Sequence, residues 1–379
     1  MNLRLYLLLF AVFLFSANVV AITNSCSLFA PVSNTFPSDP NYIEFSPDIS
    51  DEFLIWNSYY NDVNHLPGTV NLWVSDLGND KTFGTVDDGN IFIITDGIQW
   101  GQAKLTTIKN SGLPPSTIAA WINEDNSVAY CTMSAGSCIP NPSQSFVIVD
   151  SSSEFKHQLD LEKYTLGYIK QTNVSELSRN IVIRDIFTGE SDEIVVDENF
   201  YPYIKVGDKL VAWEESSNNG NIWNRINLYD FARKVTIPLY DWQNVNLHVQ
   251  DVVRYGRYSL ILVRENLTIK YFIYDHRRGT VDNGHPIFTG QYITSASLDK
   301  KQPEVLLVKL DAPSTLPERL FSIKIRSLIT NQISINSTES FGGYPIIGEN
   351  QNTVYAENYP IEQYPYTNGL ARVKIGLCS

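Results

Sequence analysis

Apolar and polar residues alternate along most of this chain in short runs, and turn-forming residues separate the runs. The clearest example extends from Pro202 to Asp230. It contains an apolar strand, a Gly207-Asp208 turn, a second strand that ends at Trp213, a polar loop, and a third strand. A period of two is typical of half-buried β-strands, and no helical period competes with it after residue 21. The pattern predicts an all-β protein.

This unit of strand, turn and strand is repeated along the chain. Copies begin at Pro47, Pro202 and, in a degraded form, Pro345, with fainter copies between them. If three units fill each interval between the starts of these copies, the repeat period is roughly 50 residues. Such a period indicates a propeller or a solenoid. The expected second strands end near Trp56, Tyr130, Ile169, Trp213, Val263, Val308 and Tyr355. In the second unit, the third strand is expected at 146–149 and the fourth at 158–161.

The two ends of the chain indicate how a ring of these units would close. The seventh unit lacks a fourth strand, and the apolar segment Cys26–Ala30 is unused at the other end. In a propeller one terminus can supply the strand that the other lacks, which would make Cys26 and Cys378 neighbours joined by a disulfide. We predict a single domain over residues 22–379, a seven-bladed β-propeller whose last blade the N-terminal strand closes. Uneven repeats leave six or eight blades open.

The first 21 residues have the pattern of a secretory signal peptide. Arg4 gives a positive start, an apolar run extends from Leu5 to Phe15, and Ala21 ends the segment with a small side chain. An uncleaved membrane anchor is the alternative. No later stretch approaches the ~18 apolar residues that a membrane span needs. We expect a protein that is secreted or held on the extracellular face of the cell envelope.

Charge and cysteine content narrow the choice of partners. The net charge is −13, so phosphate backbones are repelled and nucleic acid is a poor partner. The chain has four cysteines, and an even number in an exported protein indicates disulfides. Besides the terminal pair, Cys131 and Cys138 are expected to staple a loop. An extracellular protein or glycan is the expected partner.

The repeats resemble the TolB-like, WD40-like (PD40-type) β-propeller repeats of exported proteins. The segment from Pro202 to Asp230 carries the resemblance best, with its P-x-I start, Gly-Asp turn, L-V-A-W strand and I-N-L-Y-D strand. The resemblance covers residues 40–378, but its motifs are structural. It therefore implies a binding scaffold more than it implies a reaction.

One Asp- and Gly-rich segment, residues 76–89, is a candidate metal site. Clustered carboxylates suit Ca²⁺, a hard cation that takes six to eight oxygen ligands. The candidate ligands are Asp76, Asp80, Asp87 and Asp88. The alternative is a solvated hairpin turn in which Asp and Gly supply the required backbone angles.

Signals for catalysis are weak. The sequence contains no G-x-S-x-G or H-E-x-x-H motif, and its five histidines are scattered. Glu214-Glu215 could supply a glycosidase carboxylate, but hydrolysis needs two carboxylates at a defined separation. A solvated loop is the other interpretation of this pair. No residue is assigned as catalytic.

Three glycosylation sequons and a group of tyrosines suggest how the surface is divided. Asn173, Asn266 and Asn336 are candidate glycan sites, expected on one half of the face formed by the loops between second and third strands. Long loops of the same kind are expected at 357–369, 57–69 and 132–144. They form the other half. Candidate binding residues there are Tyr59, Tyr60, His65, Tyr359, Tyr364 and Tyr366.

Three functions remain in competition. The first is a non-catalytic binding scaffold for an extracellular protein or glycan. The second is an extracellular carbohydrate-active enzyme, and the third is a structural component of the cell envelope. Two facing carboxylates on the central axis would favour the enzyme. A Tyr-rich face would favour the scaffold, because Tyr combines a large apolar ring with a polar tip.

The disulfide pattern tests the blade register. Peptide mapping without reduction should recover Cys26 linked to Cys378 and Cys131 linked to Cys138. A bridge that closes the ring could stabilise the fold by up to ~4–5 kcal/mol in the loop-entropy model. Recovery of Cys26 linked to Cys131 would contradict the ring closure.

Overall fold

The structure is a computed structural model. It describes residues 42–50, 52–60, 69–79, 91–109, 115–134, 137–139, 146–171, 178–196, 200–217, 224–289, 293–300, 302–312, 315–327, 332–339, 346–347, 353–358 and 369–374. Within these ranges the regular structure consists of β-strands, without a helix. The all-β prediction is therefore confirmed.

The described strands form seven antiparallel sheets that follow one another in sequence order. The first three contain β1 (Tyr42–Ile49), β2 (Phe53–Tyr60), β3 (Asn71–Asp76) and β4 (Ile91–Asp96); β5 (Ile98–Ile108), β6 (Ser116–Asn123), β7 (Val128–Ser134), β8 (Ser137–Ile139) and β9 (Val147–Asp150); and β10 (Phe155–Glu162), β11 (Thr165–Gln171), β12 (Arg179–Asp185) and β13 (Ser191–Val196).

The remaining four sheets follow the same plan. They contain β14 (Phe200–Gly207), β15 (Leu210–Ser217), β16 (Asn224–Asp230) and β17 (Val235–Gln243); β18 (Leu247–Tyr255), β19 (Tyr258–Glu265), β20 (Thr268–Asp275), β21 (Thr280–Val281) and β22 (His285–Thr289); β23 (Ile293–Leu298), β24 (Glu304–Ala312), β25 (Thr315–Ser327) and β26 (Gln332–Glu339); and β27 (Ile346–Ile347), β28 (Thr353–Asn358) and β29 (Gly369–Lys374).

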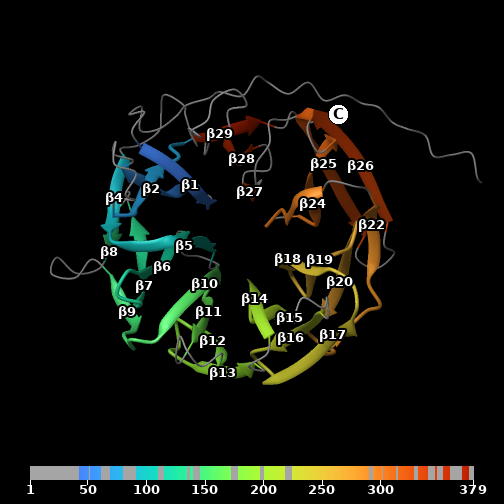
Figure 1. The fold of residues 1–379 in the computed structure, drawn as a ribbon, viewed down its shortest axis with the longest axis horizontal. Coiled ribbons are helices and arrows are strands. Elements are labelled where there is room, and N and C mark those ends of the chain that lie inside the picture. The colour runs from blue at the N-terminus through green and yellow to red at the C-terminus, as the bar shows by residue number, and fades with distance from the viewer. Residues whose placement is uncertain are drawn as a thin grey trace, which may run out of the picture.

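The sheets are arranged as the blades of a propeller around a central axis (Figure 1). The first strand of each sheet lies nearest the axis and the last lies at the rim. β1 contacts β27, β28 and β29, so the first and last sheets are neighbours and the ring is closed. Cys26–Ala30, the segment predicted to complete the last blade, lies outside the described residues.

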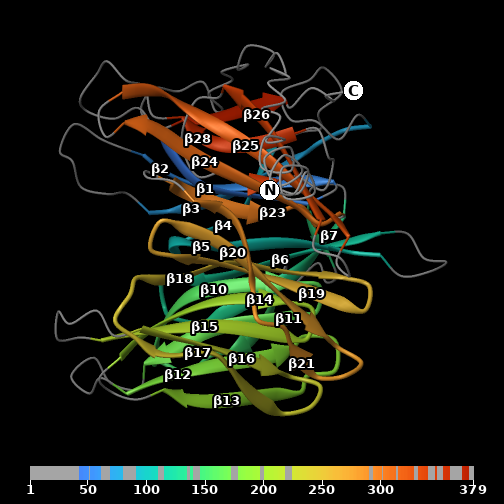
Figure 2. The ribbon, with the colours of Figure 1, turned by 90° about the vertical axis from the view of Figure 1, so that its right-hand side faces the viewer.

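Because neighbouring strands alternate in direction, the connections between them lie alternately on the two faces of the ring. Figure 2 shows the ring from the side, with one face at each end of the strands. We call the end where the first strand joins the second, and the third joins the fourth, the turn face. The opposite end, where the second strand joins the third, is the loop face. In the third and fourth sheets the turn face includes residues 163–164, 186–190, 208–209 and 231–234.

The predicted register is wrong in the second sheet. Ala129 and Tyr130 lie in β7, the third strand of that sheet, and 147–150 form its fourth strand, β9. Residues 158–161 belong to β10, the first strand of the next sheet. β5 and β6 lie in the gap between the expected second strands that end near Trp56 and Tyr130. Because the strand that ends near Tyr130 was taken as a second strand and not a third, the later strands of this sheet were each assigned one place too early or to the wrong sheet.

The core lies between the sheets, where both faces of the middle strands are covered. In β15, Leu210 and Ala212 pack in a cluster that includes Ile261 of the following sheet. Val211 and Trp213 pack in a different cluster, toward the preceding sheet. Two-sided burial explains why the second strands are nearly continuous apolar runs.

Gly207 shows how closely neighbouring sheets approach. A Cβ atom there would lie 2.6 Å from Cγ1 of Val252, so only glycine fits without a shift of the next blade. Gly207 is the last residue of β14, and the positive φ angle of the following turn belongs to Lys209, at 62°. The sequence assigned the glycine to the turn, whereas the structure requires it for packing between blades.

Adjacent blades are joined near the axis by side chains that accept backbone hydrogen bonds. Asp48 Oδ2 of β1 accepts from Leu105 N of β5 at 2.7 Å. Four further acceptors do the same for the next blade: Gln102 for Leu159 N, Asp160 for Val206 N, Glu214 for Val249 N and Asp251 for Leu298 N, at 2.7–2.9 Å. All but Glu214 lie on a first strand. An innermost strand has one uncovered edge, and these side chains satisfy N–H groups on it.

A β-bulge precedes three of these acceptors. The register between the first two strands shifts directly before Asp48, Asp160 and Asp251. Ser46 and Gln158, two residues before Asp48 and Asp160, have positive φ angles of 48° and 54°. A bulge bends its strand and re-aims the side chain that follows. The bulges therefore turn these carboxylates toward the next blade.

Removing one such acceptor should weaken the contact between two blades. Asp48 is 6% exposed, so Asp48→Ala would leave the Leu105 N–H without a partner in a buried place. We expect a loss of about 1–3 kcal/mol in the free energy of unfolding. Asp48→Asn keeps an oxygen acceptor and should lose clearly less. Equal stability of the Ala variant and the wild type in denaturant unfolding would contradict this role.

Candidate functional site

Charged residues of opposite sign alternate on three successive innermost strands. Asp160 lies on β10, Lys205 on β14 and Asp251 on β18. Burial opposes the charge of Lys205, but Tyr203 and the two carboxylates raise its pKa above its usual value. Burial raises the pKa of Asp251, and Lys205 partly offsets that effect. The axis is therefore lined by coupled charges in this part of the ring.

An ion pair crosses the axis beside this row. Lys300, which follows β23, places Nζ 3.4 Å from Oε2 of Glu162 at the end of β10. The sheets that contain these two strands lie on opposite sides of the ring (Figure 1). Burial raises the pKa of Glu162; Lys300 and Lys163 oppose that shift, and Asp251 adds to it. Ionised Glu162 is thus only partly compensated.

The turn face next to the axis continues this network through four blades. Asp208 Oδ2 accepts from Lys163 Nζ at 2.8 Å and from Arg254 at 3.1 Å. The Tyr255 hydroxyl donates to the main-chain oxygen of Asp299. Side chains of the third to sixth sheets are therefore linked around one mouth of the axis.

The axial carboxylates do not form the free pair that hydrolysis requires. One oxygen of Asp160 and one of Asp251 are hydrogen-bonded to the next blade, at 2.7 Å and 2.8 Å. Glu162 is paired with Lys300. General acid–base catalysis on a glycoside needs one protonated and one ionised carboxyl that face a common substrate. These three groups have partners within the fold instead.

Glu214 and Glu215 are not in a solvated loop, as one interpretation of the sequence had it. Both are buried in β15, at 6% and 2% exposure. Glu214 accepts from Val249 N and lies 3.2 Å from His248 Nδ1. Glu215 accepts from Trp213 Nε1 at 2.6 Å and pairs with Arg225 at 2.6 Å. Their described contacts are structural.

Aspartates at the ends of third strands have a role in turns. One oxygen of Asp230 accepts from the backbone N–H groups of Ala232 and Arg233, and the other accepts from Tyr274 of the next blade. Asp185 and Asp275 cap their turns in the same way.

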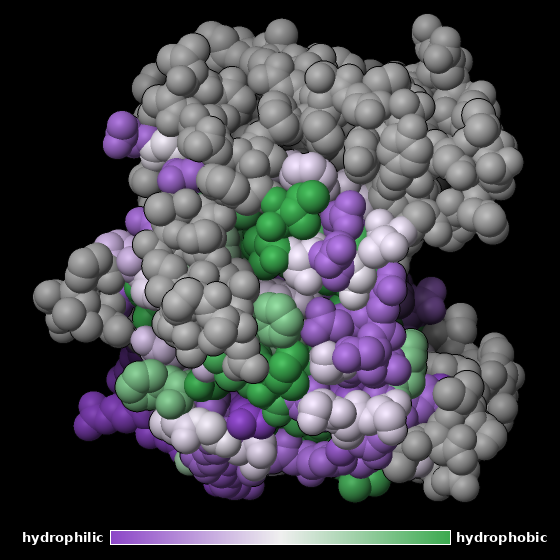
Figure 3. All heavy atoms as spheres, turned by 90° about the vertical axis from the view of Figure 1, so that its left-hand side faces the viewer, coloured by the Kyte–Doolittle hydropathy of each residue, from purple (hydrophilic) through white to green (hydrophobic). Residues whose placement is uncertain are grey.

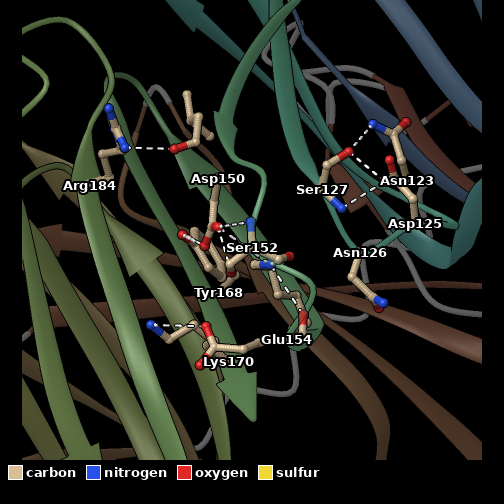
Figure 4. Close-up of polar contacts among 12 residues, drawn as sticks. Asn123, Asp125, Asn126, Ser127, Asp150, Ser152, Glu154, Tyr168, Lys170 and Arg184 are labelled. Carbon is tan, nitrogen blue, oxygen red and sulfur yellow. Dashed lines mark hydrogen bonds and ion pairs between the residues drawn. The ribbon is translucent and has the colours of Figure 1, made fainter. Parts of the chain in front are cut away.

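The same device recurs between the second and third sheets, at the end of a fourth strand. Figure 4 shows Asp150 between Ser152, which donates to it from N and Oγ, and the Tyr168 hydroxyl, which donates at 2.7 Å. Lys156 is fully buried nearby and donates to the Ser152 carbonyl at 2.7 Å. These side chains close a turn and join two blades at once.

Two of the described histidines, His157 and His276, are partly buried. Burial and the neighbouring Arg179 lower the pKa of His157 to about 4. Burial, with Arg254, lowers the pKa of His276 to about 4, and its ring lies 2.7 Å from Ser259 Oγ. Both are neutral at pH 7. Among the described residues no group of three or more His, Cys, Asp or Glu side chains could hold a metal ion.

Most of the predicted site residues lie outside the described residues. They are the binding residues His65, Tyr359, Tyr364 and Tyr366, the metal ligands Asp80, Asp87 and Asp88, the cysteines Cys26 and Cys378, and the glycan site Asn173. Tyr59 and Tyr60 end β2 at the loop face. Asp76 ends β3, and its Oδ1 accepts from Gly78 N at 2.9 Å, as in a turn.

Cysteine and sequon positions are described in part. Cys131 is buried in β7, and Cys138 of β8 pairs with Met133 in the register. Their disulfide stays a prediction. Asn266 is exposed in the turn after β19, on the loop face as expected. Asn336 was expected after a fourth strand, but it lies within β26, opposite Ser322.

One of the three loops assigned to the tyrosine surface is on the other face. Residues 132–144 were taken as a connection between second and third strands. In the structure β7 is a third strand, so the connection from β7 to β9 begins at the turn face. The true link between the second and third strands of that sheet is the tight turn from Glu124 to Ser127.

The rim of the ring carries some exposed apolar residues. On the side that holds β4 and β9, apolar side chains lie among hydrophilic ones (Figure 3). Ile93 of β4 and Val147 and Ile148 of β9 are 41–49% exposed. Nothing described covers them, and single exposed apolar residues are common on protein surfaces.

Comparison with known proteins supports the fold. No family model matches the chain, and no curated protein matches it. An oligogalacturonate lyase solved with manganese is similar in structure at 9% identity, with a TM-score of 0.57 over 93% of this chain and 98% of that one. The propeller domain of the trilobed protease from Pyrococcus furiosus gives 10% identity and a TM-score of 0.53 over 88% and 93%.

A third similar structure is an acylaminoacyl peptidase from Pyrococcus horikoshii, at 8% identity and a TM-score of 0.55 over 89% of this chain and 54% of that one. The chain is a β-propeller. Identities this low show the fold alone. Within the described part of the chain, no helix is long and apolar enough to cross a membrane.

The axial ion pair generates a prediction about pH. Because the folded-state pKa of Glu162 is raised, the folded protein holds this proton more tightly than the unfolded chain. Ionisation of Glu162 therefore removes stability as pH rises above the unfolded pKa of about 4.3. The Glu162→Gln variant does not lose stability in this way, because glutamine does not ionise.

We expect the melting temperature of the Glu162→Gln variant, relative to wild type, to rise between pH 4 and pH 7. Glu265→Gln is the matched control, since the pKa of Glu265 is lowered by Lys270 and Tyr240 although burial opposes the shift. Its relative melting temperature should fall over the same interval. A constant difference between Glu162→Gln and wild type would contradict the partial compensation of Glu162.

Proposed function

We propose that this chain is an exported β-propeller that binds an extracellular protein or glycan without catalysing a reaction. The binding surface lies on the loop face where the last and first blades meet. The repeats are of the TolB-like, WD40-like type, and the protein is secreted or held on the extracellular face of the envelope.

One observation carries this proposal: the blades that bear the predicted tyrosine loops are neighbours. β1 contacts β28 and β29, so the first and last sheets lie side by side. β2 and β28 are the second strands of the two sheets, so both end at the loop face. Tyr59 and Tyr60 end β2, and Tyr359, Tyr364 and Tyr366 follow β28. His65 belongs to the same surface.

Loops on a rigid scaffold are common places for binding residues, and Tyr gives large contact area at a low entropic cost. The side-chain bonds between blades provide the rigid support. Glycans at Asn173, Asn266 and Asn336 would lie away from the tyrosines and leave the surface accessible.

Calcium remains part of the proposal for the segment after β3. Asp76, Asp80, Asp87 and Asp88 would hold the ion, and carboxylate oxygen is the ligand type that Ca²⁺ prefers. Asp76 fits in part, since Oδ1 accepts one hydrogen bond from Gly78 N, which leaves lone pairs for an ion. The ion would stiffen a connection at the turn face.

The second candidate is a carbohydrate-active enzyme that uses the axial carboxylates of Asp160, Glu162 and Asp251. These groups come from two blades, and Asp251 raises the pKa of Glu162. One of the structures with this fold is an oligogalacturonate lyase. The partners that each carboxylate has within the fold make this the weaker candidate.

The tyrosine surface can be tested by substitution. Tyr60, Tyr364 and Tyr366 replaced together by Ala should reduce binding to a glycan array, or capture of extracellular proteins, by at least about tenfold, because aromatic anchors dominate recognition surfaces. The matched control replaces three tyrosines outside the tyrosine surface, Tyr130, Tyr203 and Tyr258, together by Ala. Retained binding in the first variant, with loss in the control, would contradict the proposal.

A further inference from the structure

The turn face of the third to fifth blades arranges its ion pairs with the cation outside and the carboxylate inside. The side chain of Lys209 is 35% exposed and its partner Asp185 only 3%. Arg233 is 37% exposed over Asp230 at 1%. The same order holds for two acids whose side chains are 18% and 11% exposed: Lys163 and Arg254 lie over Asp208, and Arg257 and Arg278 over Asp275. Glu190, which pairs with Lys234, is the exposed exception.

This order gives the surface a positive outer layer. Each pair is neutral as a whole, but the cation lies between the carboxylate and the solvent. The cation therefore screens the negative charge from a molecule outside. A molecule that approaches the turn face meets ammonium and guanidinium groups first. Fixed charge separation of this kind creates local potentials that differ in sign from the net charge. The more exposed partners of these pairs are thus cationic, although the chain as a whole carries −13.

Three lysines of this face have a strained backbone conformation. Lys163, Lys209 and Lys234 have positive φ angles of 51°, 62° and 57°. Non-glycine residues seldom adopt this conformation. The counterpart of Lys163 in the fifth blade is Gly256, at 59°, and the counterparts of Lys234 are Gly189 and Gly279, at 78° and 70°. The three lysines therefore occupy places where glycine is less strained, and strain of this kind points to function.

An aromatic pair with one exposed member lies within the same face. Phe187 is 76% exposed in the turn after β12, and its ring centroid lies 5.2 Å from that of Tyr164. Asp185, which caps the turn that holds Phe187, is the partner of Lys209. The aromatic pair and the cations are thus joined through the turns of two blades. An exposed ring offers an apolar face against which the C–H face of a sugar can stack.

We propose that the turn face of the third to fifth blades binds an anionic polysaccharide, one that bears carboxylate or sulfate groups on successive sugars. Lysine and arginine side chains bind the acidic groups, and Phe187 with Tyr164 supports a sugar ring. The surface is on the opposite face from the tyrosine loops, so the two proposals stand independently.

The charge of the molecule favours a glycan over nucleic acid. Duplex DNA carries one negative charge per ~1.7 Å, so most of its length would lie against an acidic protein. A polysaccharide with about one charge per sugar fits a small positive area and presents sugar faces to the aromatic pair.

The experiment measures binding to alginate, a polyuronate, with neutral dextran as the uncharged probe and duplex DNA as the competing polyanion. The variant is Lys163→Gly with Arg278→Gln. Glycine removes a cation and the strained conformation together, so folding should be kept or improved. Asp208 retains Arg254 as a partner. The matched control is Arg264→Gln with Lys270→Gln, which removes the same charge near the loop face.

We expect wild-type protein to bind alginate, to bind it more weakly as salt is added, and to ignore dextran. The turn-face variant should bind about tenfold more weakly at an unchanged or higher melting temperature, whereas the control should match wild type. Phe187→Ser should also weaken binding. Equal loss in the variant and the control, no loss in either, or tighter binding of DNA than of alginate would overturn the proposal.

Discussion

Each innermost strand of this ring has one edge that no strand of its own blade covers, and the fold depends on how the polar groups at that edge are satisfied. The preceding blade provides a carboxylate or amide oxygen from Asp48, Gln102, Asp160, Glu214 or Asp251. A buried N–H without a partner costs about 1–3 kcal/mol, a large part of the net stability of a protein. Hydrogen bonds between blades therefore complement the apolar contacts that hold neighbouring sheets together.

A second set of bonds acts at the outer part of the turn face. Aspartates at strand ends close their own turns and accept a tyrosine or a cation from the next blade, as Asp230 does from Tyr274. Since these carboxylates are buried beneath their cations, the bonds that join the blades also leave a positive layer on the surface. Structural cohesion and the proposed recognition of anions come from the same residues.

Much of the fold could be predicted from local pattern. Strands such as Phe53–Tyr60 and Leu210–Ser217 were recognised because an apolar run follows a turn and contains a tryptophan. The strands of the second blade were misassigned because the strand that ends near Tyr130 was taken as a second strand, whereas it is the third. The surface tyrosines could be chosen by type and by loop, but their contacts depend on segments that local pattern does not define.

The axial network could not be predicted, because its partners are far apart in sequence. Glu162 and Lys300 meet only after the ring has closed. Glu214-Glu215 was misread because an acidic pair after an apolar strand resembles the start of a loop. Only the folded structure shows that Val249 N of the next blade donates to Glu214 and that Arg225 of the adjacent strand donates to Glu215. Bonds between blades leave no periodic signal in the sequence.

Hydrogen exchange at single-residue resolution tests this view most directly. The amides of Leu105, Leu159, Val206 and Leu298 lie on uncovered edges, and their protection depends on a side chain of the preceding blade. If these bonds hold the ring together, the four amides should exchange as slowly as those within β15, and Leu105 should lose its protection in Asp48→Ala. Rapid exchange of all four in the wild type, at the rate of exposed turns, would contradict it.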